Sequence, residues 1–207
     1  MIFAYNKEQV GDVLLVILED TKDIKRSVER KGKVARVTAD ETGETLAWNI
    51  FEASSLIDIE GNGQVFLSDQ DVAVLNEELA KEGFEERLEN TQGPVFVVGQ
   101  IDEMVAHPDS DHLNLCQVNI GDKKVQIVAG APNAALGLKT IVALPGAMMP
   151  SGALIFPGKL RGEDSYGMMC APRELALPNA PQKRGIIELD DSAVVGEAFD
   201  PAKHWKG

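Results

Sequence analysis

The sequence contains few cysteines, and this limits the chemistry that it can perform. Only two are present among 207 residues, Cys116 and Cys170. They form no CxxC pair and no motif places a general base beside either, so a zinc site, a disulfide framework and a nucleophile are all disfavoured. We expect both to be small, buried apolar side chains.

Long hydrophobic runs and a leader segment are also lacking. The longest apolar run, residues 13–18, has the length of a strand and ends at Glu19 and Asp20, whereas a membrane-spanning helix needs about 20 apolar residues. Residues 1–5 lack the charged and apolar regions of a secretory signal. The sequence therefore predicts a cytoplasmic protein with no membrane association.

An excess of positive charge is missing as well. The chain has 20 Lys and Arg against 33 Asp and Glu, a net charge of −13. Residues 1–94 contain 10 basic and 20 acidic side chains, whereas residues 95–199 contain 8 and 12. The overall basic character of nucleic-acid-binding domains is absent, although a local basic face in the less acidic half could still attract RNA.

The first half, residues 1–90, is expected to fold as a small α+β domain. Two alternating runs flank a turn centred on Gly43, which is the pattern of a hairpin. The strands are expected at residues 1–5, 13–18, 33–38 and 45–51.

A helix is expected at the end of this half, over residues 69–82. Ser68 with Asp71 three positions later has the spacing of a capping box. Apolar residues follow at helical spacing, and Gly83 is expected to end the helix. Residues 91–94, Thr-Gln-Gly-Pro, are the expected linker to the second half.

Residues 95–199 differ in character and predict a small all-β barrel. Most prolines and glycines of the chain lie after Gly93, between short apolar runs, as in short strands joined by tight turns. A short helix is expected at 173–177, and residues 200–207 form a tail. The runs that supply the strands are 95–101, 115–120, 124–128, 140–144 and 185–189.

Several ordered segments of this half resemble one family. Residues 107–113, His-Pro-Asp-Ser-Asp-His-Leu, are similar to the motif that opens the tRNA-binding OB domain, and residues 118–121 to the strand that follows it. The block at 160–170, Leu-Arg-Gly-Glu-Asp-Ser-Tyr-Gly-Met-Met-Cys, resembles a motif of the bacterial phenylalanyl-tRNA synthetase beta subunit. Further similarity to that subunit lies at 127–133, 143–147, 173–175 and 185–189.

This resemblance covers about half of the chain and implies an OB-fold barrel that binds structured RNA. The remainder is too short for a synthetase catalytic module. The whole chain most resembles stand-alone bacterial proteins of the YtpR type, which join an uncharacterised N-terminal domain to this barrel. The implied partner is tRNA, while a homodimer and an association with an aminoacyl-tRNA synthetase are left open. One departure is Ala129, where family members often have Cys, and we expect it to affect packing only.

The implied RNA-binding surface centres on residues 159–168. It offers cations for phosphate, a ring on which a base can stack, and the Ser and Met positions that contact RNA in relatives. Two lysines in a turn between strands would add phosphate contacts. The expected RNA-binding residues are Lys159, Arg161, Ser165, Tyr166, Met168, Lys123 and Lys124.

Two alternatives come from other classes of function. The same barrel occurs in secretion chaperones that resemble CsaA, so a protein-binding or chaperone-like module is the alternative function. His107, Asp109, Asp111 and His112 have side chains suited to a divalent metal in a hydrolase, but the resemblance assigns them to the structure of the loop. No phosphate-binding glycine motif is present. We therefore predict no metal, no cofactor and no catalytic residues.

Overall fold

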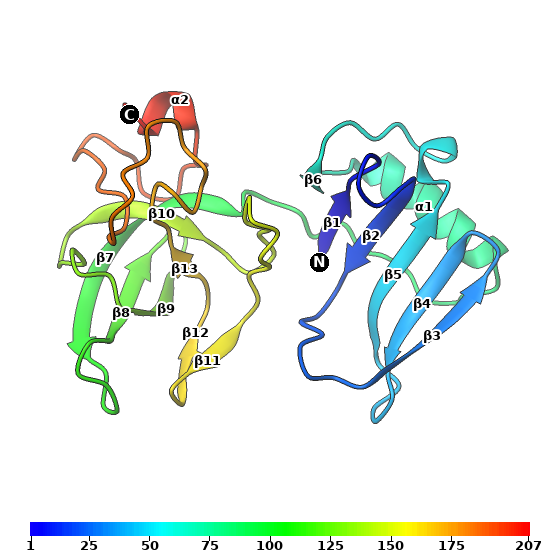
Figure 1. Cartoon of the computed structure of the whole chain (residues 1–207), viewed down its shortest axis with the longest axis horizontal. Coiled ribbons are helices and arrows are strands. Elements are labelled where there is room, and N and C mark those ends of the chain that lie inside the picture. Colours follow the sequence, from blue (N-terminus) through cyan, green and yellow to red (C-terminus); the bar gives the residue numbers. More distant parts are fainter. The chain divides into compact units, whose positions relative to one another are not determined.

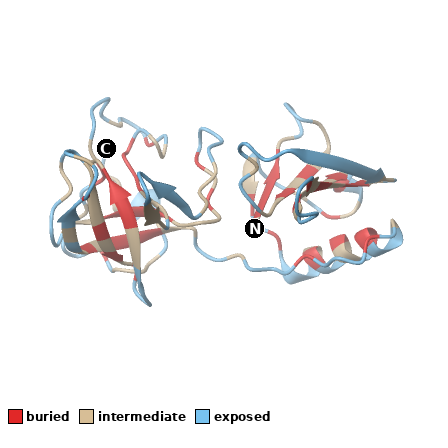
Figure 2. Ribbon diagram, turned by 90° about the horizontal axis from the view of Figure 1, so that it is seen from below, coloured by how far each residue is buried: buried red, intermediate tan, exposed pale blue.

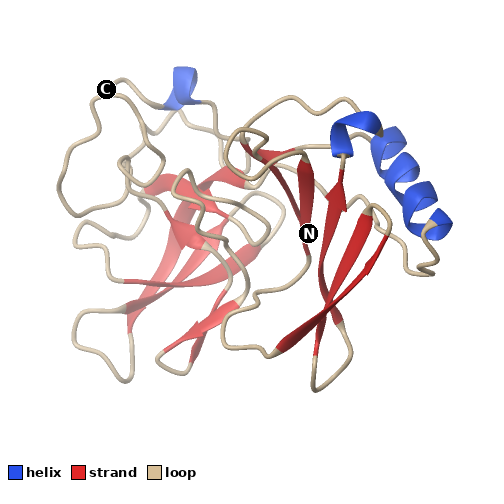
Figure 3. Cartoon of the chain, turned by 45° about the vertical axis from the view of Figure 1, so that its right-hand side comes forward, coloured by secondary structure: helices blue, strands red, loops and turns tan.

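The computed structural model describes all 207 residues and divides into two compact units, Met1–Gly93 and Pro94–Gly207. Both units consist mostly of β-strands with few helices (Figures 1 and 3). None of the helices has both the length and the apolar character needed to cross a membrane.

The first unit contains a six-stranded antiparallel sheet with the order β3-β4-β5-β2-β1-β6. β4 and β5 form the expected hairpin, and Gly43 lies in the left-handed region at φ 73°. The edge strands β3 and β6 were not predicted, because β3 is polar and exposed and β6 has only three residues. The strands are β1 (Ile2–Tyr5), β2 (Val13–Ile17), β3 (Arg26–Lys31), β4 (Val34–Ala39), β5 (Thr45–Phe51) and β6 (Gly63–Val65).

One helix of more than a single turn, α1 (Asp69–Lys81), lies along one face of this sheet (Figure 2). The predicted capping box is confirmed. Ser68 Oγ accepts from the N–H of Asp71 at 3.2 Å, and the N–H of Ser68 donates to Asp71 Oδ2 at 2.9 Å. Gly83 follows the helix at φ 81°. The unit is mostly sheet, so the expected α+β class overstates its helical part.

The core of this unit lies between α1 and the sheet. Leu75 and Leu79 of α1 are fully buried and belong to the same apolar cluster as Trp48 of β5. Phe84 meets Trp48 edge-on, with ring centroids 5.0 Å apart. Such an aromatic pair adds about 0.5–1.5 kcal/mol beyond the apolar area that it buries.

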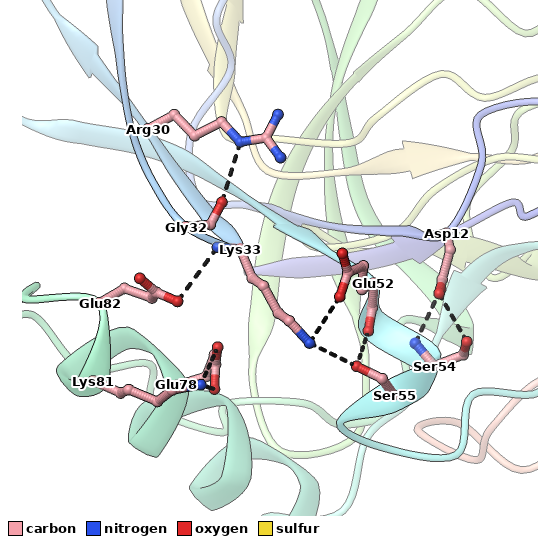
Figure 4. Close-up of polar contacts among 10 residues, drawn as sticks. All are labelled: Asp12, Arg30, Gly32, Lys33, Glu52, Ser54, Ser55, Glu78, Lys81 and Glu82. Atoms are coloured by element: carbon pink, nitrogen blue, oxygen red, sulfur yellow. Dashed lines mark hydrogen bonds and ion pairs between the residues drawn. The ribbon is translucent and has the colours of Figure 1, made fainter.

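Polar contacts attach α1 and the short 3-10 turn Ala53–Ser55 to the sheet (Figure 4). Lys33 Nζ lies 2.9 Å from Glu52 Oε2 and 3.0 Å from Ser55 Oγ. Its main-chain N–H also donates to Glu82 Oε1, just beyond α1, at 3.4 Å. The hydrogen bond with Glu52 raises the pKa of Lys33. Lys33 and Glu52 therefore compensate each other's charge within the unit.

The second unit contains a five-stranded antiparallel sheet with the order β13-β10-β7-β8-β9. Its two edge strands, β13 and β9, contact each other, so the sheet nearly closes into a barrel. The long strand β7 bends at a bulge between Ile101 and Glu103, as strands in small barrels do. The elements are β7 (Phe96–Ala106), β8 (Asn114–Asn119), β9 (Lys124–Ala129), β10 (Lys139–Ala143), the separate hairpin β11 (Gly158–Leu160) and β12 (Glu163–Ser165), β13 (Met168–Met169) and α2 (Pro201–His204).

Apolar clusters cover both faces of this sheet. One, which includes Cys116, contains apolar residues from β7, β8, β9 and β10. The other, which includes Cys170 and Trp205, joins the opposite face of β7 and β10 to the C-terminal segment. Both cysteines are 0% exposed, and burial raises the pKa of Cys116 to about 11 and that of Cys170 to about 12. The prediction that they are buried apolar side chains is confirmed.

Two elements predicted for this unit are wrong. Residues 185–189 are not a strand, although the N–H groups of Ile187 and Leu189 donate to carbonyls of the barrel. Residues 173–176 form turns and Leu177 has no regular structure, because Ala176 lies in the left-handed region at φ 51°, which interrupts a helix. The other four expected strands correspond to β7, β8, β9 and β10.

Candidate nucleic-acid interface

The loop at residues 107–113 and the β11–β12 hairpin are joined through His107. Its ring is 4% exposed, and Nδ1 accepts from the N–H of Asp109 at 3.0 Å. Nε2 therefore carries the proton, and it donates to the carbonyl of Leu160 in β11 at 3.2 Å. Both ring nitrogens have hydrogen-bond partners in the fold, which makes His107 a structural anchor of the hairpin and not an available metal ligand.

Lys159 and Arg161 lie on this hairpin, and both are exposed. Lys159 Nζ is 3.1 Å from Asp164 Oδ1, but the two side chains are 68% and 48% exposed, and such pairs contribute little stability in water. Arg161 lies at the hairpin turn with φ 49°, and its Nη1 donates to the carbonyl of Asp109 at 3.1 Å. A carbonyl does not neutralise a guanidinium, so Arg161 still offers its charge to an anion.

Residues 165–168 connect the hairpin to the barrel. Ser165 Oγ accepts from the N–H of Val128 at 3.1 Å, so this expected RNA contact has a structural role. The N–H of Tyr166 donates to the carbonyl of Gln126 at 2.8 Å, and its side chain is 42% exposed. The structure therefore places Tyr166 beside β9 with part of its ring open to solvent.

Lys123 and Lys124 lie at the start of β9, whose later residues Gln126 and Val128 bond to the hairpin segment, but at the opposite end of β8 from the loop that contacts Arg161. They follow β8, whereas the 107–113 loop that contacts Arg161 precedes it (Figure 1). Six residues of strand span about 20 Å. Lys124 Nζ also lies 3.2 Å from both Asp102 and Glu103, and these hydrogen bonds raise the pKa of Lys124. Lys124 is exposed, but it lies beside two carboxylates, whereas Lys159 lies beside one.

A cavity of about 250 Å³ lies beside Met168, and we call it the arginine pocket. Two of its residues, Arg173 and Arg184, were not among the expected site residues. Arg173 lies within a segment that carries the family resemblance, whereas Arg184 lies in a loop whose sequence has no indicative spacing. The pocket is lined by residues 128–132, 168–169, 171, 173–174 and 184–186.

Comparisons with known proteins match both units. Residues 96–198 match the family described as "Putative tRNA binding domain", and residues 21–91 match a "Domain of unknown function (DUF4479)". Over 195 residues the chain is 45% identical to the "Putative tRNA-binding protein YtpR" of Bacillus subtilis, covering 94% of this chain and 97% of that protein. The chain belongs to the YtpR family.

The second unit of this YtpR-family chain also matches part of a larger enzyme subunit. It is 51% identical over 102 residues to the "Phenylalanine--tRNA ligase beta subunit" of Rhodospirillum rubrum, covering 49% of this chain and 12% of that subunit. The same subunit of Paramagnetospirillum magneticum is 48% identical over 113 residues, covering 51% and 14%. The crystal structure of the C-terminal domain of Plasmodium vivax p43 aligns with a TM-score of 0.37 and 24% identity, covering 49% of this chain and 56% of that one.

Proposed function

We propose that this chain is a non-catalytic tRNA-binding protein whose second unit, an OB-fold barrel, contacts structured RNA. The observation that carries the proposal is the 45% identity, over 94% of the chain, to a relative described as a putative tRNA-binding protein. The match of residues 96–198 to a tRNA-binding domain family assigns the contact to the second unit.

The geometry of the β11–β12 hairpin supports this assignment. Lys159, Arg161 and Tyr166, which we call the hairpin surface, are exposed on or beside the same short hairpin. Cations of this kind contact phosphates, and an exposed ring stacks with a base at about 1–3 kcal/mol per base. His107 fixes the hairpin to the 107–113 loop through Leu160. The hairpin therefore loses little conformational entropy when RNA binds.

The first test is the salt dependence of binding of total bacterial tRNA to the full chain, measured by fluorescence anisotropy. If about four phosphates are contacted, the logarithm of the affinity falls against the logarithm of salt with a slope of about −3. The double variant Lys159→Ala, Arg161→Ala should bind more weakly, and its slope should be shallower by about 1.5 because two phosphate contacts are lost. Its thermal unfolding should change little because both side chains are exposed.

The matched control removes two lysines from the first unit. Lys22→Ala, Lys25→Ala deletes the same amount of charge at exposed positions and should leave the slope unchanged. Unchanged affinity in the hairpin variant would show that RNA binds elsewhere. No binding by the unmodified chain at low salt would contradict the proposal and favour a protein partner, such as a synthetase or a chaperone client.

A third variant tests whether the contact extends along β8. Lys123→Ala, Lys124→Ala should weaken binding less than the hairpin variant, because Lys124 is already paired with Asp102 and Glu103. An equal loss of affinity would show that RNA contacts residues at both ends of β8.

A further inference from the structure

The arginine pocket has an apolar floor and is small. Val128, Ala129, Met169 and Ile186 line it and are only 5–8% exposed. Its volume of about 250 Å³ lies below the roughly 300–1,000 Å³ of pockets that enclose drug-sized ligands. A flat group of a single ring system suits this space better than an extended ligand.

The rim of the pocket is charged. Arg184 Nη2 donates to the carbonyl of Gly130 across the pocket at 3.3 Å, and Arg173 Nη1 donates to the carbonyl of Lys183. Neither guanidinium is paired with a carboxylate, so no ion pair compensates the positive charge of either arginine. The one carboxylate in the lining, Glu174, accepts from the N–H of Ala171 through Oε2 at 2.7 Å. Its second oxygen is an acceptor that can face a ligand.

The walls of the pocket are held in place by Asn133. Its Oδ1 accepts from the N–H of Ile186 at 2.9 Å, and its Nδ2 donates to the carbonyl of Ile186 at 3.0 Å. Gly185 lies at φ 137°, and a Cβ there would be 3.1 Å from Asn133 Oδ1. The loop that carries Arg184 is thus fixed against residues 130–133 before any ligand arrives, which lowers the cost of binding.

We propose that the arginine pocket receives one unstacked base of the bound RNA. The base lies between Met168 and the guanidinium plane of Arg184, and Arg173 contacts the adjoining phosphate. Single-stranded positions of RNA are recognised in this manner, by stacking on aromatic or guanidinium planes and by hydrogen bonds to exposed base edges. Glu174 accepts from a donor on the base edge. This inference rests on the proposed function and names the part of the RNA that the second unit holds.

The position of the pocket favours RNA over a peptide. Tyr166 of the hairpin surface and Met168 of the pocket are two residues apart, so one RNA strand can contact both. With two arginines and one glutamate, the lining has a net positive charge, although the whole chain carries −13.

The inference is tested by NMR of the full chain labelled at its methionine methyl groups. The chain has six methionines, of which Met168 and Met169 line the pocket and Met1 lies in the first unit. On addition of tRNA or of a short single-stranded RNA, the ring current of the base should shift the methyl signals of Met168 and Met169. The signal of Met1 should stay in place.

Two variants and one control decide the cause of the shift. Arg184→Gln should remove the shift and weaken tRNA binding at least about fivefold, the lower bound for loss of one stacked base. Met168→Ala should weaken binding without altering either arginine. Lys183→Gln removes the same charge from the neighbouring residue, which does not line the pocket, and should keep the Met169 shift. Methyl spectra of the free variants report whether the pocket is still folded.

The outcomes separate the inference from the proposed function. If tRNA binds by anisotropy while the methyl signals of Met168 and Met169 do not move, the inference is wrong and the proposed function stands. If tRNA does not bind, both are wrong. If an aspartate-rich peptide moves the two signals and RNA does not, the pocket holds a protein segment and the inference is overturned.

Discussion

In the first unit, residues 1–93, 10 basic side chains are outnumbered by 20 acidic ones, whereas residues 94–207 contain 10 basic and 13 acidic. Four of the basic side chains of the first unit are paired with carboxylates of the same unit. Arg36 lies between Glu29 and Glu86, so its charge is compensated. Arg36 therefore links β4 to β3 and to the segment after α1, and Lys31, Lys33 and Lys81 are also paired with carboxylates.

The arginines at the proposed site of the second unit have main-chain partners, as do Arg26 and Arg30 of the first unit, which donate to the carbonyls of Thr21 and Gly32. Arg161, Arg173 and Arg184 each donate to a main-chain carbonyl, and none is paired with a carboxylate. A carbonyl fixes the direction of a guanidinium without cancelling its charge. The comparison teaches that the net charge of a chain does not predict the potential at a site, because that depends on which charges lie within a few ångströms of each other.

The largest expected effect is a loss of stability in the first unit. The variant that causes it also shows whether the first unit takes part in tRNA binding. Trp48→Ala removes a side chain that is 1% exposed and packs edge-on against Phe84, and should lower the free energy of unfolding of the first unit by about 3–5 kcal/mol. Urea unfolding followed by circular dichroism measures this loss. The affinity for tRNA should not change, because the hairpin surface lies in the second unit.

Val28→Ala is the control for that experiment, because Val28 is 63% exposed and its truncation should change stability by less than about 0.5 kcal/mol. Weaker tRNA binding by the Trp48 variant would show that the first unit contributes to the RNA contact. It would contradict the assignment of RNA binding to the second unit alone.

A smaller effect is expected at the start of α1. Ser68→Ala removes the side-chain acceptor of the capping box and should destabilise the first unit by about 1 kcal/mol. Ser68→Thr should retain most of the stability. Thermal unfolding of the two variants measures the difference, and equal values would mean that packing of α1 against the sheet, and not its cap, sets the stability of the helix.

The smallest expected effect lies at the C-terminal end of the second unit and depends on pH. Hydrogen bonds from Lys203 and then from His204 lower the pKa of Glu197 from 4.5 to about 2. Because the folded-state pKa is depressed, the stabilisation is present above about pH 4.5 and is lost as the pH falls towards about 2.

The variant Glu197→Gln isolates this contribution. It should be less stable than the unmodified chain at neutral pH, and the difference should vanish near pH 2. Thermal unfolding between pH 2 and pH 7 measures it. A difference that stays constant over this range would show that the ionised form of Glu197 does not stabilise the second unit.

Several local features of the fold could be predicted from the sequence. The capping box of Ser68 and Asp71, the left-handed glycine after α1 and the β4–β5 hairpin all depend on residues that are close in the chain. The strand expected at residues 185–189 failed for the opposite reason. Ile186 packs in the cluster that includes Cys116, whereas Ile187 and Leu189 pack in the cluster that includes Cys170, and an apolar run of that length fits this role as well as a strand.

The candidate site was predictable only in part. The motif at residues 160–170 located the hairpin surface, but no pattern in the sequence indicated that Lys124 would pair with Asp102 and Glu103. Nor did any pattern indicate that Arg184, in a loop without a motif, would line a pocket with Met168. Spacing along the chain does not show which distant carboxylates reach a cation.

By itself, the sequence determined the short-range elements, the division near residue 93 and the family resemblance that leads to tRNA. Only the tertiary structure decided which cations remain uncompensated and which of them lie together. Arg184 reaches Gly130 across 54 positions, and His107 reaches Leu160 across 53. Such contacts form when the barrel nearly closes, because closure brings segments from its two ends within hydrogen-bonding distance.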